Sequence, residues 1–499
     1  MERLGLVDLG SGTARLVVYA YEPGRWFRLV DEIREPVRLG EGLASGHLTP
    51  EAQARAQKAL RLFADFARAT GLETVEVMAT SALRDAKNGP SLLQALEGIG
   101  LPIRVLSGEE EARLGALAVA NSFPWEEAWV VDLGGGSVQI SRLEGRRFVQ
   151  GRAYPLGAVR LKERFLLGDP PRKREVVALE AHVLEVLREP LKALAQRPAP
   201  LVAMGGTVRN LAEMVQKRKG YPLNLLHGYW LAREDLEGIV EEILSLPLSA
   251  RRELEGLQPD RADILPAGAL VYRTLLRAAG YQGLWVSGQG LREGRFYQHF
   301  LPPPHLLEDV RRFSVENLFA QYPQEPGHTA RVRNLARTLF RALGPLHGYG
   351  PEEERLLDEA ALLHDIGMSL GYYDHHKHGA YLVAASPLPG MDHRTQALLA
   401  LLVRYHRKGK PQPGPYRSLF LRGDAKRLER LAALLRLAEY LDRSRVGRVK
   451  GVEVRLEGGR VELWLRAPEE PWAEMVEAGK QAGLFQKAFG LELEVRWTP

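Results

Sequence analysis

Two short segments combine an aspartate with glycines and hydroxyl side chains, and both begin in an apolar run. The first is Val7-Asp8-Leu9-Gly10-Ser11-Gly12-Thr13, and the second is Val131-Asp132-Leu133-Gly134-Gly135-Gly136-Ser137. Glycines let backbone N–H groups approach an anion closely, and an aspartate at a strand end can hold a metal ion or orient a water molecule. Either aspartate alone could instead stabilise its own turn. Because the pattern occurs twice, it predicts a duplicated fold whose two loops close on phosphate groups.

The segments around the first loop alternate between strand and helix patterns. The loop joins two apolar strands into a hairpin, after which we expect a helix over residues 51–70 and strands over 74–79 and 103–106. A further helix is expected to begin at Glu109. The same order starts again near Trp129, which indicates a second α/β lobe of similar plan.

Glycine junctions also follow two later strands of the second lobe. The strand expected over residues 201–204 ends in Gly205-Gly206-Thr207, and the strand over 284–287 precedes Gly290-Leu291-Arg292-Glu293-Gly294. The ends of strands in open α/β sheets meet at one crevice. We therefore expect all of these glycine junctions to converge on a single cleft.

The last part of the chain has a different pattern. Leu301-Pro302-Pro303-Pro304 is typical of a linker. Residues 305–445 then predict an almost wholly helical domain, with helices over 332–343, 353–364, 395–405 and 427–441. The tail predicts a small α/β domain, with strands over 452–456, 461–465 and 491–495 and a helix near 471–480.

Composition limits the kinds of site that are possible. The 499 residues are enough for three or four domains, and the absence of cysteine excludes disulfides, cysteine nucleophiles and thiolate metal sites. Any metal must therefore be bound by histidines and carboxylates. A net charge of +6 mildly favours anionic partners. The sequence has no RNA-binding stripe, signal peptide or membrane-length segment, so we expect a cytoplasmic protein without specific nucleic-acid or membrane partners.

The duplicated Asp-Leu-Gly hairpins resemble those of the actin, Hsp70 and sugar-kinase superfamily. Within it, the chain resembles the exopolyphosphatase and guanosine-pentaphosphatase (PPX/GppA) family over essentially its whole length. Besides the two loops and residues 290–294, the resemblance rests on Thr80-Ser81-Ala82-Leu83-Arg84-Asp85-Ala86 and Leu106-Ser107-Gly108-Glu109-Glu110-Glu111-Ala112-Arg113. These motifs occur in the order that the family has.

The resemblance implies a four-part organisation. Residues 1–122 and 123–300 would form two actin/ribonuclease H-like lobes. Residues 301–445 would form a helical domain, and residues 446–499 a small C-terminal α/β domain. We also expect a homodimer.

For the cleft, the resemblance implies hydrolysis of a phosphoanhydride with Mg²⁺. Glu111 would be the base that activates water, assisted by Asp132 and by Arg84. The alternative for Arg84 is that it only forms a surface salt bridge. Asp8, Asp132 and Gln139 would surround Mg²⁺, which prefers carboxylates, waters and substrate oxygens. The groups expected to bind phosphate are Ser11, Gly12, Thr13, Gly134, Gly135, Gly136, Ser137, Gly205, Gly206 and Thr207.

Glu111 lies in the first turn of a predicted helix, where the helix dipole would keep an isolated glutamate ionised and weakly basic. A polyanionic substrate would then raise its pKa. The alternative is that Glu109, Glu110 and Glu111 merely complement the helix dipole.

Two residues depart from the family's pattern. Gly12 replaces an Asn and loses a side-chain donor, and Gln139 replaces a Glu and loses a negative charge. Metal affinity and any mechanism with two carboxylates are therefore in doubt, and Glu111 would have to act as the single base.

The helical domain resembles the HD phosphohydrolase superfamily, because it contains His328, His364-Asp365 and Asp442 in that superfamily's order. The resemblance implies that these four residues would surround one metal. His378 and His406 occur where binuclear members of the superfamily keep extra metal ligands, whereas we expect no ligand role for the adjacent His375 and His376. Such ligands suit Mn²⁺, Fe²⁺ or Zn²⁺. The alternative is a structural relic that only guides polyphosphate.

A basic loop in this domain, with Arg404, His406, Arg407, Lys408 and Lys410, is a candidate track for a long polyanion, although most charge runs are simply solvated.

Four functions are open at this point. The leading one is removal of terminal phosphate from inorganic polyphosphate, and the next is hydrolysis of the 5′ γ-phosphate of pppGpp. A kinase or ATP-driven chaperone on the same lobes is a different class, and the Ser-Gly-Glu-Glu-Glu-Ala-Arg segment and the lack of a β-rich peptide-binding domain speak against it. A non-catalytic polyphosphate or alarmone sensor is the fourth, motivated by Gly12 and Gln139.

Overall fold

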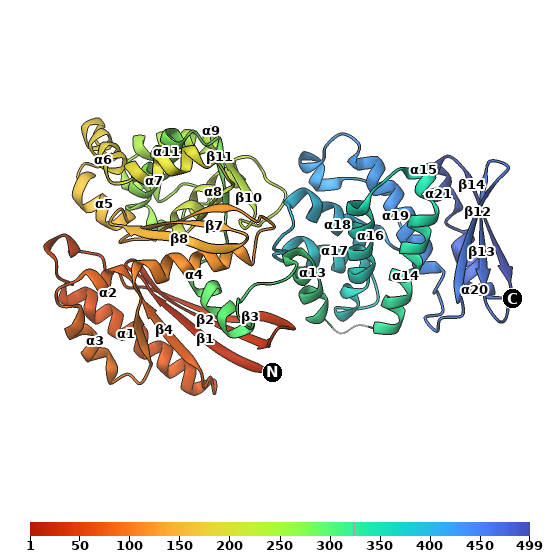
Figure 1. Cartoon of the computed structure of the whole chain (residues 1–499), viewed down its shortest axis with the longest axis horizontal. Helices are drawn as coiled ribbons and strands as arrows, with labels where there is room; N and C mark the ends of the chain where they lie inside the picture. The colour runs from red at the N-terminus through yellow and green to blue at the C-terminus, as the bar shows by residue number, and fades with distance from the viewer. Residues whose placement is uncertain (323–324) are drawn as a thin grey trace. The chain divides into compact units, whose positions relative to one another are not determined.

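The computed structural model describes residues 1–322 and 325–499 (Figure 1). The chain forms two compact units. Unit 1 comprises Met1–Tyr221 and Leu225–Val310, and unit 2 comprises Pro222–Asn224 and Arg311–Pro499. Among the described helices, none combines the length and the apolar character needed to cross a membrane.

The first sheet of unit 1 has five strands in the order β3-β2-β1-β4-β5. Its strands are β1 (Glu2–Leu9), β2 (Thr13–Glu22), β3 (Trp26–Pro36), β4 (Val75–Ala79) and β5 (Ile103–Val105). The accompanying helices are α1 (Pro50–Ala69), α2 (Ser81–Asp85), α3 (Gly89–Glu97) and α4 (Gly108–Ala120). Since β1 runs antiparallel to β2 and parallel to β4, the first glycine loop and the end of β4 lie at the same edge of this sheet.

The second sheet of unit 1 has six strands in the order β10-β11-β9-β6-β7-β8. Its strands are β6 (Ala128–Leu133), β7 (Val138–Glu144), β8 (Arg147–Tyr154), β9 (Leu201–Met204), β10 (Tyr229–Ala232) and β11 (Gly283–Val286). Its helices are α5 (Ala158–Phe165), α6 (Lys173–Val186), α7 (Arg188–Gln196), α8 (Gly206–Arg218), α9 (Arg233–Ser245), α10 (Leu248–Arg251), α11 (Leu265–Ala279) and α12 (Leu291–Phe300).

The two sheets repeat one local plan around the glycine loops. In the first, Asp8 pairs across the hairpin with Arg15, and in the second Asp132 pairs with Gln139. As in the first sheet, the hairpin strand β6 is antiparallel to β7 and parallel to β9. The duplication predicted from the sequence is therefore present, and it gives each aspartate the same place at a strand end.

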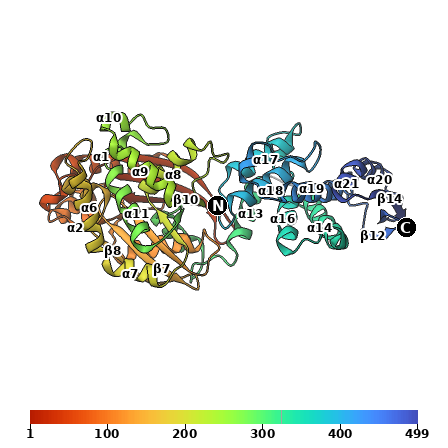
Figure 2. The same cartoon turned by 90° about the horizontal axis from the view of Figure 1, so that it is seen from above.

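Unit 2 consists of helices followed by a three-stranded sheet (Figures 1 and 2). The helices are α13 (Val310–Ala320), α14 (Pro326–Ala342), α15 (Gly344–His347), α16 (Pro351–Leu363), α17 (His375–Ala385), α18 (His393–Tyr405) and α19 (Asp424–Tyr440). The sheet has β12 (Gly451–Glu457), β13 (Arg460–Arg466) and β14 (Glu492–Thr498), and α20 (Trp472–Gly479) and α21 (Ala482–Phe489) pack against β14.

The helices and the sheet of unit 2 share one hydrophobic core, in which Leu434 of α19 and Leu463 of β13 are fully buried. The sequence places a domain boundary at residues 445/446, whereas this core continues across it. The order of two α/β lobes, a helical region and a small α/β segment agrees with the predicted fold class.

Candidate active site

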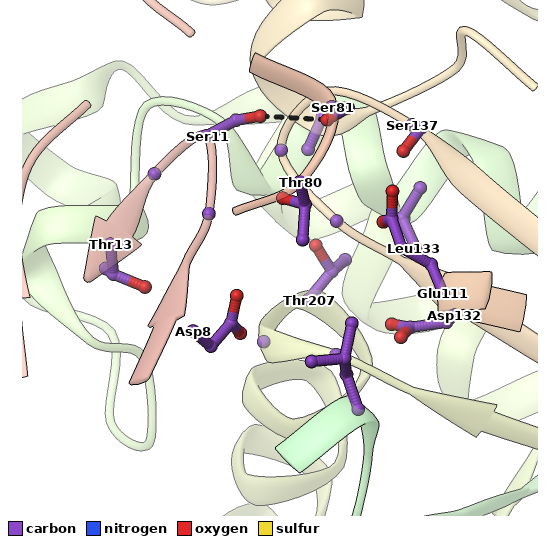
Figure 3. Close-up of a pocket in the computed structure, with 18 of the residues that line it drawn as sticks. Asp8, Ser11, Thr13, Thr80, Ser81, Glu111, Asp132, Leu133, Ser137 and Thr207 are labelled. Atoms are coloured by element: carbon purple, nitrogen blue, oxygen red, sulfur yellow. Dashed lines mark hydrogen bonds between the residues drawn. The ribbon is translucent and has the colours of Figure 1, made fainter. Parts of the chain in front are cut away.

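Unit 1 contains a cavity of about 150 Å³ that both glycine loops line. Asp8 at the end of β1 and Asp132 at the end of β6 lie on opposite sides of it (Figure 3). The hydroxyl oxygens of Ser11 and Ser81 are 3.1 Å apart at its rim. The predicted residues that line the cavity are Asp8, Ser11, Gly12, Thr13, Glu111, Asp132, Gly134, Gly135, Ser137, Gln139, Gly205, Gly206 and Thr207.

Two glycines let the backbone pass where a side chain would not fit. Gly205 has a φ of +100°, and a Cβ there would lie 2.4 Å from the carbonyl oxygen of Leu133. A Cβ on Gly136 would lie 2.3 Å from Oγ of Ser81. Gly136 is a predicted phosphate-binding residue, but it is not among the residues that line the cavity, and its carbonyl accepts a hydrogen bond from Nε of Arg160 at 3.1 Å. Gly136 therefore allows the close approach of the two loops.

The three consecutive glutamates at the start of α4 have different surroundings. Glu109 pairs with Arg113 at the surface, and Glu110 accepts the backbone N–H of Ser107 at 2.8 Å in a capping box. These two stabilise the helix end, as the alternative interpretation expects. Glu111 is only 6% exposed and faces the cavity.

Both carboxylate oxygens of Glu111 are held by neighbouring side chains. Nη1 of Arg84 donates to Oε1 of Glu111 and also, at 2.7 Å, to the carbonyl oxygen of Leu106. Nε2 of Gln139 donates to Oε2 of Glu111 and to Oγ of Ser137, each at 2.9 Å. The carboxylate is therefore fixed in orientation. Gln139, which the sequence predicts beside Mg²⁺, contacts the predicted base.

Burial raises the pKa of Glu111 to about 7, although the hydrogen bond and charge of Arg84 act in the opposite direction. Burial alone thus raises this pKa in the protein without substrate, whereas the sequence led us to expect the rise from a bound polyanion. A carboxylate with such a pKa can accept a proton from water near neutral pH.

Asp8 and Asp132 are buried carboxylates that share the cavity. Burial raises the pKa of Asp8, and burial together with the charge of Asp8 raises the pKa of Asp132 to about 6. Two such groups are costly to ionise across one cavity, and a divalent cation between them would lower that cost. The oxygen donors of this pair therefore fit Mg²⁺.

Four arginines that sequence reasoning did not assign to the site also line the cavity: Arg15, Arg209, Arg261 and Arg292. Burial lowers the pKa of Arg15 and of Arg261 to about 10, and repulsion from Arg292 adds to the effect at Arg15. Guanidinium groups that are partly or fully withdrawn from water and repel one another are stabilised by an anion between them.

Some of these arginines had a signal in the sequence. Arg15 follows the first loop on an alternating strand, Arg209 lies in the first turn after Gly205-Gly206, and Arg292 lies within a quoted motif. Arg261 ends a short 3₁₀ helix, Pro259–Arg261, in a segment without any motif.

A second cavity of about 150 Å³ adjoins the first and shares Gly12, Thr13, Arg261 and Ile264 with it. Arg34, Arg38 and Lys162 are among its other lining residues. Arg84 lines neither of these cavities and instead lines another one, together with Glu109 and Ser137. Arg84 therefore contacts the predicted base without lining the cavity itself.

In unit 2, the structure brings together three of the four predicted metal ligands. Ligand atoms of His328, His364 and Asp365 lie within 4.8 Å of one another. The fourth, Asp442, lies behind this group, because its Oδ2 is 2.8 Å from Nδ1 of His328, the ring atom that faces away from His364. Asp442 therefore lies outside this group of ligand atoms.

The accessory histidines also differ from the expectation. Asp365, His375 and His406 form a second group of atoms within 4.8 Å, whereas His378 belongs to neither group found in the described chain. His375, which the sequence suggests is filler, thus takes the place expected for His378. His406 is fully buried and is not part of an exposed basic loop.

Comparison with known proteins identifies the family. A family model described as the Ppx/GppA phosphatase family matches residues 17–302, more than half of the chain, and one described as Ppx/GppA phosphatase, domain III matches residues 310–478. The chain belongs to the Ppx/GppA phosphatase family. This confirms the resemblance drawn from the sequence motifs.

Solved structures agree with this assignment. An exopolyphosphatase from Cytophaga hutchinsonii has a TM-score of 0.57 and 26% identity, covering 60% of this chain and 98% of that one. A Ppx/GppA family member from Aquifex aeolicus has a TM-score of 0.51 and 27% identity, covering 59% of this chain and 96% of that one. Such likenesses confirm the predicted actin-like lobes.

The two departures from the Ppx/GppA pattern can now be placed. A Cβ on Gly12 would meet nothing within 4 Å, so the missing Asn side chain would have room at the cavity. Gln139 supplies an N–H to Glu111 where a Glu would bring a second negative charge.

Proposed function

We propose that this protein is an exopolyphosphatase, which releases orthophosphate from the end of inorganic polyphosphate. The observation that carries the proposal is the position of Glu111, a buried carboxylate with a raised pKa at a cavity lined by four arginines and two glycine loops. Hydrolysis of a phosphoanhydride needs an oriented water, a base and neutralisation of charge, and little else.

In this proposal Glu111 takes a proton from the attacking water while the water oxygen forms a bond to the terminal phosphorus. The bridging P–O bond breaks, and the shortened polyphosphate leaves with the electron pair. Arg84 and Gln139 hold the carboxylate in place. Arg15, Arg209 and Arg292 balance charge on the phosphoryl oxygens.

Mg²⁺, if bound, would be held by Asp8 and Asp132 and would neutralise charge on the transferred group. Gln139 is occupied by Glu111 and Ser137, so the two aspartates are the stronger candidates for metal ligands.

The adjoining cavity favours polyphosphate over pppGpp. No aromatic side chain is among the residues that line either cavity, so a nucleobase would find no ring to stack on there. The second cavity is lined by cations and also by four carboxylates, Glu41, Glu163, Asp260 and Asp263, three of which pair with Arg34 or Arg38. Further phosphates would therefore have to compete with these carboxylates for the two arginines.

The direct experiment measures orthophosphate release from long polyphosphate, tripolyphosphate and pppGpp, each with Mg²⁺. We expect turnover of long polyphosphate to exceed that of pppGpp. Faster turnover of pppGpp would show that the protein is a pppGpp phosphohydrolase instead. Binding of these compounds without phosphate release would show that it is a non-catalytic sensor.

A further inference from the structure

A cavity of about 480 Å³, here called the side cavity, adjoins the active-site cavity at Glu111. Its lining includes Arg84, Asp85, Glu109, Ser137 and Arg152. Ser137 lines the active-site cavity as well, and Arg84 contacts Glu111, which lines the active-site cavity. The two cavities are therefore neighbours, and the Arg84–Glu111 pair and Ser137 lie between them.

Arg152 supplies a cation where the side cavity meets solvent. It is an exposed residue near the end of β8, and within the described part of the chain it forms no ion pair with a carboxylate. Its guanidinium lies over the ring of Tyr154, with 5.7 Å between Cζ and the ring centroid. Arg152 can therefore bind an anion without first losing a carboxylate partner.

Arg84 supplies a second cation, at the inner side of this cavity. Its Nη1 donates to Glu111 and to the carbonyl oxygen of Leu106, and its Nε lies 3.4 Å from Asp85. Nη2 of the same guanidinium has no acceptor among the described residues. One N–H group of Arg84 is therefore available to an anion in the side cavity.

Two carboxylates also line the side cavity, and each is paired with an arginine that does not line it. Asp85 pairs with Arg160 at 2.7 Å, and Glu109 pairs with Arg113 at 2.9 Å. Their charges are therefore balanced from outside the cavity, and the charge of Arg152 is not balanced within it.

In-line attack places the two products of the proposed reaction on opposite sides of the transferred phosphorus. The water that Glu111 activates approaches from the side of Glu111, so the shortened polyphosphate leaves on the other side. Figure 3 shows Thr13 across the site from Glu111 and Ser137, and Thr13 lines the cavity that adjoins that other end. The new orthophosphate thus lies beside the side cavity and can enter it without passing the remaining chain.

The proton transfer itself frees Arg84 for the product. While Glu111 is ionised, its negative charge holds the guanidinium of Arg84. Once Glu111 has taken the proton of the attacking water it is neutral, so this attraction is lost. Arg84 then faces a newly formed phosphate anion, which binds a guanidinium strongly.

We propose that the side cavity binds the orthophosphate product and releases it to solvent while the shortened polyphosphate stays in the cleft. Arg84 receives the anion beside Glu111. Ser137, whose hydroxyl oxygen already accepts from Gln139, donates its O–H at the passage. Arg152 draws the anion outward. The inference rests on the exopolyphosphatase activity proposed above, and it lets one chain be shortened repeatedly without being released.

The test is inhibition of the full chain by inorganic phosphate, with long polyphosphate as the substrate. Phosphate in the side cavity binds while polyphosphate occupies the cleft, so a higher polyphosphate concentration should not relieve the inhibition. Arg152→Glu should raise the inhibition constant of phosphate by about tenfold or more and change the KM for polyphosphate little. Arg152→Lys keeps the charge and should stay close to the wild type.

Arg147→Glu, at the exposed start of the same strand, is the matched control. It makes the same change of charge outside the side cavity and should leave the inhibition constant near that of the wild type. Because Arg152 and Arg147 are both exposed, all of these variants should fold, and their thermal midpoints check this.

A second measurement separates cleavage from release in the first turnover. Cleavage is followed by rapid quenching, and free orthophosphate by a fluorescent phosphate-binding reporter. Arg152→Glu should cleave polyphosphate at the wild-type rate but show a delay before orthophosphate appears in solution.

Inhibition that excess polyphosphate relieves would place orthophosphate in the substrate's path and overturn the proposal. So would equal inhibition constants in Arg152→Glu and Arg147→Glu. Either result would leave the exopolyphosphatase activity standing, because that activity is decided by phosphate release from the wild type without added phosphate. A wild type that releases none would contradict the activity, and this inference with it.

Discussion

In unit 1 the cationic side chains that line the cleft are all arginines, whereas the buried polar cluster of unit 2 consists of histidines and carboxylates. The guanidinium groups of Arg15, Arg209, Arg261 and Arg292 keep their protons and repel one another, so they suit an anion that arrives and leaves. The histidine rings of unit 2 are instead anchored through Nδ1 with their lone pairs turned inward, which suits a cation that stays. The two regions thus differ in the charge that their side chains are arranged to meet, negative in the cleft and positive in the cluster.

The largest effect on activity is expected from a change of Glu111. Removing its ability to take a proton, in Glu111→Gln, should lower the rate of phosphate release by about 10²–10⁴-fold while leaving substrate binding nearly intact, because the amide keeps the shape of the side chain. Phosphate release and polyphosphate binding are measured side by side. Glu109→Gln, on the exposed first turn of the same helix, is the control and should remain near the wild-type rate. Near-native turnover of Glu111→Gln would move the chemistry to another residue.

The interpretation of the cleft as an anion-binding site depends on the arginines that line it. Arg209→Met should raise the KM for polyphosphate by about 10- to 100-fold, the value of one charge-assisted hydrogen bond. Arg218→Met, at the exposed end of the same helix and paired with Glu242, should change the KM little. If both variants have the wild-type KM while folding normally, the arginines do not contact substrate.

Arg84 should control the pH at which the cleft works. Its guanidinium favours the ionised form of Glu111. In Arg84→Met the pKa of Glu111 therefore rises further, and the acid limb of kcat/KM should move to higher pH by about one to two units. Arg104→Met, which removes the surface partner of Glu110, should leave the limb in place. A limb that moves to lower pH would contradict the assignment.

Gln139→Glu should have the smallest effect, with two readouts. A carboxylate beside Asp132 should lower the Mg²⁺ concentration for half-maximal rate, and the loss of the N–H donated to Glu111 should move the acid limb to higher pH. Gln150→Glu, on the exposed neighbouring strand, adds the same charge away from the cleft and should do neither. An unchanged Mg²⁺ requirement would place this side chain outside the metal's surroundings.

The sequence predicts the cleft more completely than the metal centre, for a physical reason. The residues around Glu111 lie in glycine loops and at helix starts, where the chain must take special conformations and leaves a readable pattern. Arg261 had no such signal, because it reaches the cavity from the end of a short 3₁₀ helix, Pro259–Arg261, that carries no motif. Which of Glu109, Glu110 and Glu111 faces the cavity also depends on the capping box, which uses Glu110.

In unit 2 the choice among neighbouring residues was beyond the sequence. Glu439 and Asp442 are three residues apart, a spacing that puts both near one face of a helix, so periodicity cannot say which nitrogen of His328 each one meets. In the structure Glu439 meets Nε2, and Asp442, which lies past the end of α19 at Tyr440, meets Nδ1. His375 and His378 have the same spacing, and α17 was missed because its first turn, His375-His376-Lys377-His378, lacks apolar periodicity.

The proposed mechanism depends most on Glu111, which acts as the base with a pKa that burial raises. The decisive measurement is the pH dependence of kcat/KM for long polyphosphate in the wild type and in Glu111→Gln. At each pH, the wild-type value is divided by that of the variant. The substrate's own ionisation cancels in this ratio. Because the base must be deprotonated, the ratio should rise with pH up to about 7 and then level off. A ratio that stays flat across this range would show that Glu111 does not titrate in catalysis.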